Sequence, residues 1–500
     1  MIKADVIIIG GGATGCGIAR DLALRGIPHC LIEKGDFAAG ATGACHGLLH
    51  SGGRYVVIDP IAARECYDEN LILRRIGKKC VEQTGGLFVR LPGDSKRFRE
   101  MFLRGCEEVG IPAEVISSTK AIDLVPNLNP EIEEAIKVPD CSIDPFRLCM
   151  LNIRTSQLRD SIIFTRHKVT EIVQSHGRCI GIKATDQATG ELREIRGNII
   201  VNATGAWANM IASLAGCEVP MTLSKGSLVI TNHRLTNMVI NRLRPPSDGD
   251  IIVPNEAVCL AGTTSLAVEN PDKIGIESTE VDTIISEAGR MIPHFNDTRI
   301  IRAFSGVRPL LKSKKMDAHE ISRGFQIIDH QNGMYSIVGG KLSTFRLMAE
   351  KMVDVIMASF KLKKSCETAE IPLDGQEELS GYPLSKRLAD MKDIVCECEL
   401  VNRKAVERII NQTGTRNVGD ITHRTRLGMG PCQGGFCTFR ALGIMNDMSV
   451  ISPEQSMEML RGFLQRRFRG IRYALWGDQL REEQLVEYIY LGILAMEKPQ

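Results

Sequence analysis

The stretch Val6–Gly15, which reads Val-Ile-Ile-Ile-Gly-Gly-Gly-Ala-Thr-Gly, decides the fold of this 500-residue chain. Its β-branched start predicts a short strand, and its glycines predict a tight turn into a helix that ends before Gly26. A second apolar run at residues 29–32 predicts another strand, which completes a β-α-β unit with parallel strands. The sequence therefore predicts an α/β fold whose first domain is doubly wound, of the Rossmann type.

The three glycines Gly10, Gly12 and Gly15 form the pattern G-x-G-x-x-G, and Glu33 follows at the end of the second predicted strand. In this context the first glycine allows the tight turn and the second lets a pyrophosphate approach the backbone. The third lets the helix pack on the strand. The acidic residue would accept hydrogen bonds from a ribose. The pattern predicts a dinucleotide site. The alternative is a glycine-rich turn that binds no nucleotide. The pattern alone does not distinguish NAD from FAD.

Composition limits the classes of function. Lys plus Arg number 62 and Asp plus Glu number 60, so the formal charge is +2 and no chain-wide basic field exists to hold nucleic acid. The longest apolar runs, such as residues 488–494, are far shorter than the roughly 18 residues that cross a bilayer. The start of the chain lacks the apolar core of a signal peptide, so a cytoplasmic location is expected. In that compartment the 16 cysteines should be thiols, metal ligands or redox groups.

The chain changes character several times, which predicts a discontinuous first domain. The expected oxidoreductase part covers residues 1–360, with dinucleotide-binding segments at about 1–85, 142–216 and 294–360 and an inserted β-rich substrate domain at about 86–141 and 217–293. A linker is expected at 361–392, a compact cysteine-bearing domain at 393–445, and a helical tail at 446–500.

Several motifs resemble known flavoproteins. Residues 199–207 and 336–341, taken with the opening glycines, resemble the cofactor-touching segments of the D-amino-acid-oxidase-like flavoprotein superfamily. The loop 47–55 and the segments 305–310 and 339–346 resemble FAD-dependent glycerol-3-phosphate dehydrogenases, and this likeness extends over residues 1–360. The resemblance implies FAD rather than NAD, and oxidation of sn-glycerol 3-phosphate to dihydroxyacetone phosphate by hydride transfer to the flavin.

The resemblance also implies which side chains face the substrate: Arg54, Tyr55, Arg308, Arg323 and Lys341. Arginine offers a planar fork of donors that suits a phosphate dianion, and lysine adds a point charge. Single arginines are more often solvated surface groups, so the prediction depends on their place inside the matching motifs.

His50 is the candidate for proton transfer, because removing hydride from a carbinol carbon requires a base that takes the hydroxyl proton. Arg308, expected beside the flavin, is the second catalytic candidate. A hydrogen-bonded structural histidine is the alternative for His50.

The residues expected to contact FAD lie in the same motifs. They are Gly10, Gly12, Ala13, Thr14, Gly15, Glu33, Lys34, Thr42, Gly43, Leu48, Val169, Ala203, Thr204, Gly205, Trp207, Gly306, Gly340, Lys341, Leu342 and Ser343.

Two close cysteine pairs, Cys396-x-Cys398 and Cys432-x4-Cys437, can offer four thiolates to a metal centre. The pattern resembles the bacterioferritin-associated-ferredoxin-like domain, which holds a [2Fe-2S] cluster and forms the C-terminal module of anaerobic glycerol-3-phosphate dehydrogenase A subunits. A tetrathiolate zinc site is the alternative, although zinc fingers usually space paired ligands by two to four residues.

This family resemblance, which covers nearly the whole chain, implies B and C partner subunits, a quinone as the final acceptor, and attachment to the inner face of the cell membrane through those partners. Two other functions stay open. One is a flavin-dependent dehydrogenase of a 2-hydroxy acid, amino acid or opine, and the other is an iron-sulfur docking or assembly protein without catalysis. The basic, amphipathic stretch 461–472 has three interpretations: contact with anionic lipid, contact with an acidic partner, or a solvated helix face.

Overall fold

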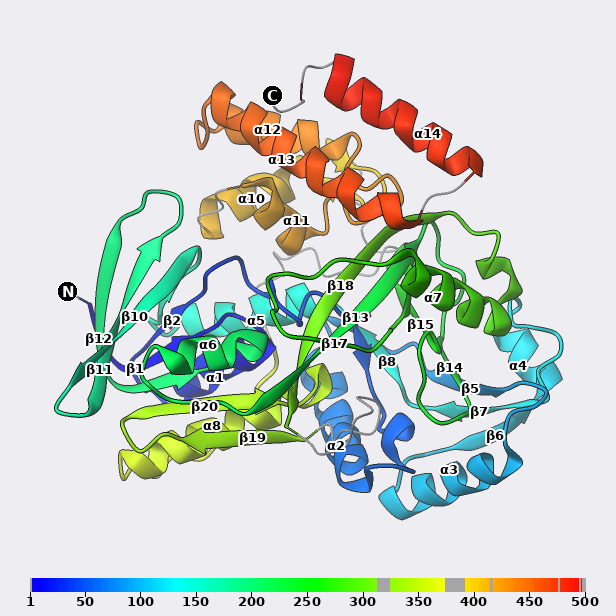
Figure 1. Ribbon diagram of the computed structural model, residues 1–500, viewed down its shortest axis with the longest axis horizontal. Helices are drawn as coiled ribbons and strands as arrows, with labels where there is room; N and C mark the ends of the chain where they lie inside the picture. Colours follow the sequence, from blue (N-terminus) through cyan, green and yellow to red (C-terminus); the bar gives the residue numbers. More distant parts are fainter. Residues whose placement is uncertain are drawn as a thin grey trace.

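The computed structural model describes residues 2–312, 324–373, 392–413, 417–474, 477–493 and 496. Two large sheets lie beside each other, and the C-terminal helices cover one side of both (Figure 1). The predicted fold class is confirmed: a doubly wound α/β sheet, a second β-rich sheet, and a small C-terminal domain with a helical tail.

The first sheet is doubly wound. Its strand order is β10-β11-β12-β1-β2-β9, with β20 paired to β12 and β19 to β20. Strands β1, β2, β9, β12 and β20 run parallel, whereas β10, β11 and β19 are antiparallel additions. The bounds are β1 Ile2–Ile9, β2 His29–Ile32, β9 Ile162–Phe164, β10 His167–Ser175, β11 Arg178–Asp186, β12 Leu192–Asn202, β19 Phe325–Asp329 and β20 Met334–Gly339.

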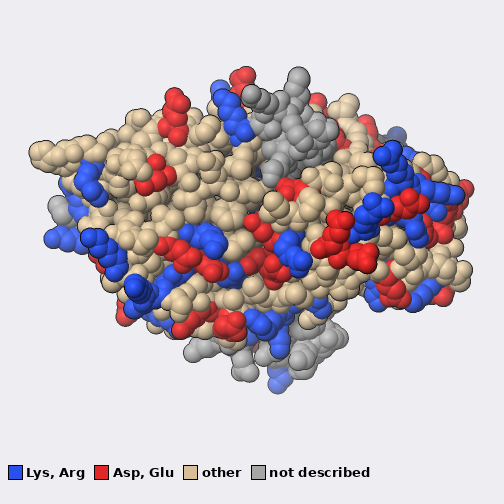
Figure 2. Space-filling model, turned by 90° about the horizontal axis from the view of Figure 1, so that it is seen from below, with Lys and Arg blue, Asp and Glu red and all other residues tan. Residues whose placement is uncertain are grey.

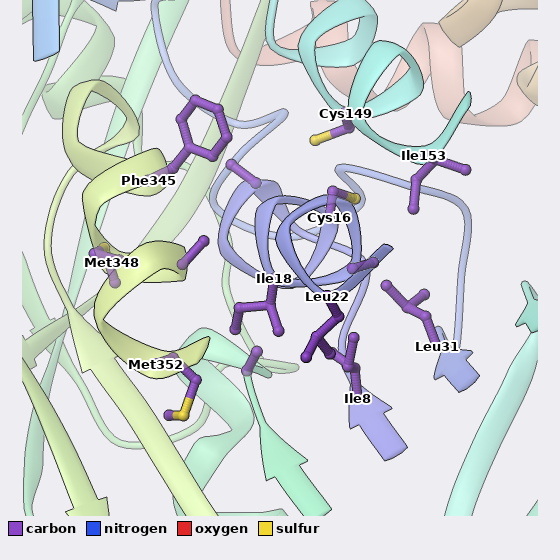
Figure 3. Packing of buried hydrophobic residues seen from close by; sticks show 14 of the residues in the cluster. Ile8, Cys16, Ile18, Leu22, Leu31, Cys149, Ile153, Phe345, Met348 and Met352 are labelled. Carbon is purple, nitrogen blue, oxygen red and sulfur yellow. The ribbon is translucent and has the colours of Figure 1, made fainter. Parts of the chain in front are cut away.

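The second half of strand β1, Val6–Ile9, is buried on both faces, which explains its uninterrupted run of apolar residues. Val6 and Ile8 belong to one hydrophobic core, and Ile7 and Ile9 belong to the core on the opposite face. The first core is covered by α1 (Ala13–Leu24), α5 (Pro145–Gln157) and α8 (Phe345–Ser359), and the second by α6 (Ala208–Ser213). Figure 3 shows α5 and α8 on either side of α1, with Cys149 and Phe345 directed toward it.

The second sheet has the order β17-β13-β16-β15-β14-β5-β7-β6, and β18 pairs with β13. Most of its pairs are antiparallel, and α7 (Ser278–Met291) packs on its core. The strands are β5 Gly86–Arg90, β6 Glu114–Ser117, β7 Glu134–Val138, β13 Met221–Thr231, β14 Val239–Arg242, β15 Ile251–Asn255, β16 Val258–Gly262, β17 Leu266–Val268 and β18 Ile300–Leu311.

One strand departs from the expected domain division. Strand β18 lies in the segment 294–360 that the sequence assigns to the dinucleotide-binding part, yet it pairs with β13 along almost its whole length, from Met221–Leu311 to Thr231–Ile300. The Gly-Val-Arg motif at 306–308 suggests a cofactor-touching segment, and the sequence carries no signal for the sheet that pairs with it. A strand of the second sheet therefore brings this motif to the boundary between the sheets.

Three helices and a small third sheet accompany the two large sheets. In Figure 1 helix α2 (Pro60–Ile76) lies at the bottom centre, α3 (Lys96–Val109) at the lower right and α4 (Ser118–Leu124) at the right edge. A small sheet, β3-β8-β4, joins β3 (Leu48–Leu49), β4 (Val81–Glu82) and β8 (Cys141–Ile143). On the face that Figure 2 shows, basic and acidic side chains are interspersed.

The C-terminal part begins with the hairpin β21 (Ile394–Cys396) and β22 (Val401–Asn402). Helices α10 (Arg403–Thr413), α11 (Val418–Thr425), α12 (Cys437–Asp447), α13 (Pro453–Ile471) and α14 (Gly477–Glu487) follow. Within the basic stretch, Arg467 forms an ion pair with Glu483 of α14, and α13 packs against β18. None of the described helices is both long and apolar enough to cross a membrane.

Candidate functional site

A cavity of about 770 Å³ lies between the two sheets. Its walls come from the β1–α1 turn, the loop after β2, the end of β12, strand β18 and the connection from β20 to α8. This volume falls within the range of small-molecule and cofactor sites. The cavity therefore gathers segments from both ends of the first 350 residues.

Most of the predicted cofactor residues line this cavity: Gly10, Gly12, Ala13, Thr14, Glu33, Lys34, Thr42, Leu48, Val169, Ala203, Thr204, Gly205, Trp207, Gly306, Gly340, Lys341 and Leu342. Gly15, Gly43 and Ser343 do not line it. A Cβ on Gly15 would lie 1.9 Å from the Gly10 carbonyl oxygen, so this glycine serves helix-to-strand packing. The Ser343 hydroxyl accepts a hydrogen bond from the His50 amide at 3.1 Å, which makes it a support for the neighbouring loop.

The glycine-rich turn has the shape of a cradle for a pyrophosphate. Gly10 adopts φ of 111°, and a Cβ there would lie 2.6 Å from the Ala203 carbonyl oxygen. Helix α1 begins after Gly12, which has no side chain to cap it, and the Thr42 hydroxyl accepts a hydrogen bond from the Ala13 amide at 3.1 Å. The amino end still carries the other N–H groups of the first turn and the positive end of the helix dipole. These features fit the phosphates of a dinucleotide.

Glu33 closes the turn from the other side. Its carboxylate accepts hydrogen bonds from the Gly11 amide at 2.6 Å and the Gly35 amide at 2.7 Å. Burial raises the pKa of Glu33, and the two amide hydrogen bonds oppose that rise. Each carboxylate oxygen keeps a second lone pair, so the group can still accept a ribose hydroxyl.

The loop His50–Tyr55 is anchored to its surroundings through the backbone. The Ser51 amide donates to the buried Asp140 carboxylate at 2.6 Å, and Gly52 adopts φ of 97°. The turn that follows directs Arg54 into the cavity, where its guanidinium forms an ion pair of 2.8 Å with the buried Asp250. The Arg54 side chain is thereby fixed in place with further donors available.

Arg308 reaches the same end of the cavity from β18. A Cβ on Gly226 would lie 2.3 Å from Nη2 of Arg308, so only a glycine leaves room for the guanidinium on strand β13. The guanidinium donates to the Ser224 hydroxyl at 3.3 Å, to the Thr264 carbonyl at 3.1 Å and to the Thr263 hydroxyl.

Three further predicted residues meet at this end. The rings of His50 and Tyr55 lie edge to face with centroids 5.3 Å apart, and Nζ of Lys341 lies 5.0 Å from the Tyr55 ring centroid. His50, Tyr55 and Lys341 all line the cavity together with Arg54 and Arg308. Arg323 lies outside the described residues. Five of the six residues predicted for substrate and catalysis thus converge on one place.

Sequence reasoning missed two features of the cavity. His46, four residues before His50, also lines it. The second is Asp272, which lines another part of the wall and accepts a hydrogen bond from the indole of the predicted Trp207 at 2.8 Å; Nζ of Lys34, also predicted, lies 3.7 Å from the Trp207 ring centroid. The missed histidine stands in a loop without periodicity, so no pattern in the sequence marked it.

The four predicted metal ligands lie together in the C-terminal domain. Among the described residues no three Cys, His, Asp or Glu side chains converge as ligands of a single ion would. Instead the thiols contact one another in pairs: Cys437 hydrogen-bonds to Cys396 and to Cys432, and Cys398 to Cys432.

Backbone amides complete the thiol site. The hydrogen bond from Cys437 lowers the pKa of Cys432 to about 5 against the opposing effect of burial, and hydrogen bonds from Cys398 and the amides of Gly434 and Gly435 add to this. A Cβ on Gly430 would lie 2.4 Å from the Cys398 Cβ, so the loop can pass close to this ligand only as glycine. Thiolates that accept amide hydrogen bonds suit an iron-sulfur cluster.

The C-terminal domain is fastened to the loop that lines the cavity. Asp36, which follows Glu33 by three residues, forms an ion pair with Arg424 at 2.9 Å and a hydrogen bond with Nδ1 of His423 at 2.8 Å, both on α11. Burial raises the pKa of Asp36, but the hydrogen bond from His423 and the charge of Arg424 outweigh it and hold the pKa well below its usual range. The His423 ring also stacks on Phe146 with centroids 4.4 Å apart.

A second buried connection runs between the thiol site and α5. Arg426 pairs with Glu399, next to Cys398, at 2.9 Å and with Asp144, the N-cap residue of α5, at 3.0 Å. Both carboxylates and the guanidinium are at most 7% exposed. The C-terminal domain therefore meets the first domain in a buried interface that contains ion pairs.

The fold and the cavity define a flavin-dependent oxidoreductase, and the model of the FAD dependent oxidoreductase family matches residues 5–346. The BFD-like [2Fe-2S] binding domain matches residues 394–447. The chain is 41% identical to the A subunit of the anaerobic glycerol-3-phosphate dehydrogenase of Escherichia coli K12, over 100% of this chain and 98% of that protein. It is also 41% identical to the A1 subunit of the enzyme of the same name in Haloferax volcanii, over 99% and 91% of the two chains.

The chain belongs to the family of anaerobic glycerol-3-phosphate dehydrogenase A subunits. Its cofactors are FAD and a [2Fe-2S] cluster, which decides between the iron-sulfur and zinc alternatives. Among solved structures, the glycerol-3-phosphate dehydrogenase of Bacillus halodurans has the same fold, with a TM-score of 0.68, 20% identity, and coverage of 95% of this chain and 96% of that chain. The L-alpha-glycerophosphate oxidase of Mycoplasma pneumoniae gives a TM-score of 0.61 at 21% identity, over 75% and 100% of the two chains.

Proposed function

We propose that this chain oxidises sn-glycerol 3-phosphate to dihydroxyacetone phosphate. The observation that carries the proposal is the convergence of Arg54, Arg308 and Lys341 with His50 and Tyr55 in one cavity, which also contains the glycine-rich cradle. The cations supply the charge that a phosphate ester needs, and the cradle supplies the place for the dinucleotide. The same cavity therefore contains groups that can bind the phosphorylated alcohol and a place for the flavin cofactor.

The phosphate is held by the cationic end of the cavity. Asp250 offsets part of the charge of Arg54, whereas Arg308 donates to the neutral oxygens of a serine hydroxyl and a threonine carbonyl. With Lys341 the site keeps a net positive charge toward a dianion, and the guanidinium groups add directional hydrogen bonds. Arg323, which belongs to the residues that the family resemblance implies, is proposed to join them.

His50 is proposed to take the proton from the C2 hydroxyl while hydride leaves the C2 carbon. FAD, when bound, supplies the hydride acceptor. Arg308, on the same end of the cavity, is proposed to stabilise the oxygen as it loses its proton.

We further propose that the C-terminal domain with the four cysteines, residues 394–447, transfers the two electrons one at a time. From this thiolate module they would pass to partner subunits and finally to a quinone. The relatives are named as subunits of a dehydrogenase, which supports the existence of partners. The buried ion pairs Asp36–Arg424 and Asp144–Arg426 hold the thiolate module against the cavity loop after β2 and against α5, which supports a relay between the two sites. On this proposal the protein works at the inner face of the cell membrane through its partners.

The test uses the purified holoenzyme with an artificial dye as electron acceptor. Reduction of the dye with sn-glycerol 3-phosphate is expected, with bleaching of the flavin absorption when the dye is omitted. Turnover with 2-hydroxyglutarate, an amino acid or an opine instead would contradict the proposed substrate. A protein that carries the cluster but oxidises none of these would favour the docking or assembly alternative.

A further inference from the structure

His46 occupies an unusual position in the cavity. It lies on the loop between the glycine-rich part and His50, and its ring is edge to face with that of His50 at 6.3 Å between centroids. Its electrostatic neighbours are the guanidinium groups of Arg54 and Arg308. The His46 ring therefore lies at the end of the cavity where the proposed phosphate ester binds.

The imidazole of His46 has an unused polar atom. Nδ1 is buried and has no hydrogen-bond partner among the described residues. A buried polar atom without a partner is costly, so such atoms in native proteins call for an explanation. The ring lines the cavity but Nδ1 itself is covered, so a ligand group pairs with this nitrogen once the ring turns toward the cavity.

The chemistry of the ring limits what that group can be. Burial, followed by the charges of Arg54 and Arg308, lowers the pKa of His46 to about 3, so the free protein holds a neutral ring. A neutral imidazole offers one donor and one acceptor, which matches a hydroxyl group. The neighbouring arginines, in contrast, are suited to the phosphate, and His50 is proposed to serve the C2 hydroxyl.

We propose that His46 binds the terminal C1 hydroxyl of the substrate through Nδ1 and thereby selects a glycerol phosphate over esters that lack this hydroxyl. The inference rests on the proposed function and deepens it. His46 is then a specificity-determining residue that touches the substrate away from the carbon that is oxidised.

The test measures the wild type and a His46 variant, each with two substrates. Wild-type holoenzyme is assayed with sn-glycerol 3-phosphate and with the matching enantiomer of 1,2-propanediol 1-phosphate, which lacks only the terminal hydroxyl. We expect kcat/KM of the wild type to fall by about 100-fold for the analogue, because the site would leave its polar atom unpaired. In His46→Ala we expect the two substrates to differ by no more than about threefold, because the partner of the hydroxyl is gone.

A conservative variant and a binding measurement protect the test from a folding defect. His46→Asn places an amide near the position of Nδ1 and should recover most of the preference for sn-glycerol 3-phosphate. Calorimetric titration of the dithionite-reduced protein, which binds without turnover, should show the same loss and recovery in Kd. Flavin content per chain should stay at the wild-type level, and His233→Asn, an exposed histidine outside the cavity, should behave as the wild type.

The outcomes are distinct. Equal losses for both substrates in His46→Ala would overturn the inference, because the residue would then act at the C2 hydroxyl or on the cofactor. An unchanged preference in His46→Ala would also overturn it. If the wild type oxidises neither phosphate ester, the proposed function itself fails.

Discussion

The flavin cavity and the thiolate module are two redox sites built in different ways. The cavity takes its walls from residues between Ile9 and Met348, and much of its shape is backbone that only glycine permits, as at Gly10 and Gly226. The thiolate module takes its ligands from one stretch between Cys396 and Cys437. Its chemistry lies in four side chains, supported by nearby amides.

Because of this difference, we expect single substitutions to affect the two sites differently. A chelating site loses its metal centre when one ligand is removed, because each ligand is a bond. A cavity shaped by backbone and several cations tolerates more, because its contributions are spread over many contacts. The buried ion pairs between the thiolate module and the rest of the chain determine how strongly a substitution in one site changes the other site.

The largest effect is expected from Cys432→Ser. Loss of one of the paired thiols should abolish the cluster, so the iron content should fall to background while the flavin absorption stays at the wild-type level. Visible spectra and iron analysis check both together. Cys217→Ser, which changes a half-buried thiol outside the module, should leave both unchanged. Loss of flavin together with iron would show that the cavity depends on the module.

The converse change is Arg308→Leu, which alters the cavity alone. We expect kcat/KM for sn-glycerol 3-phosphate to fall by about 1,000-fold, because phosphate affinity and stabilisation of the reacting oxygen are both reduced. Iron content should not change. Arg97→Leu, at an exposed position of α3, is the matched control and should keep wild-type kinetics. A loss of less than about threefold would remove Arg308 from the proposed site.

Asp36→Asn tests the interface between the two sites. Removing one partner of a buried ion pair costs about 3 kcal/mol, whereas an exposed pair contributes little. We therefore expect a lower Tm for Asp36→Asn, and almost no change for Asp478→Asn, whose ion pair with Arg481 is fully exposed.

The same pair predicts a dependence on pH. The pKa of Asp36 is lowered in the folded protein, so its contribution to stability is complete above the unfolded value of about 4 and is lost as the pH falls through the folded value. The difference in Tm between wild type and Asp36→Asn should thus be full at pH 7 and shrink below about pH 4. A difference that stays constant with pH would contradict the assignment of charge to this pair.

The smallest effect is expected from Gly93→Ala, which serves as the matched control for Gly10→Ala. Gly10→Ala introduces both a positive-φ residue and a Cβ 2.6 Å from a carbonyl oxygen, whereas Gly93→Ala introduces only the positive φ of 89° into open space. Positive φ alone costs about 1 to 2 kcal/mol. Gly10→Ala should therefore lower flavin content and Tm, and Gly93→Ala should lower Tm slightly with full flavin content. Equal flavin loss in both would show that strain, and not the shape of the cradle, controls cofactor binding.

Local motifs made much of this protein predictable. The strand-turn-helix at Val6–Gly15 is predictable from the sequence, because Gly10 and Gly15 lie where a Cβ would clash with backbone oxygen atoms. The cysteine pairs can also be recognised in the sequence, because the ligands of one metal centre lie close together in the chain. Prediction went wrong where partners are remote: β18 pairs with β13, and its place in the second sheet depends on a strand about 80 residues earlier.

The sequence by itself determined the doubly wound fold, the dinucleotide turn and the thiolate set, because these depend on backbone conformation and short spacing. The family resemblance implied that Arg54, Arg308 and Lys341 face one substrate, and the tertiary structure shows the cavity that they share. Only the tertiary structure decided that His46 stands among them with a nitrogen that has no partner within the described residues, and that Asp36 joins the two modules. Those arrangements arise from strands and loops far apart in the chain. Their distances are set by how the sheets pack, which no local pattern of residues encodes.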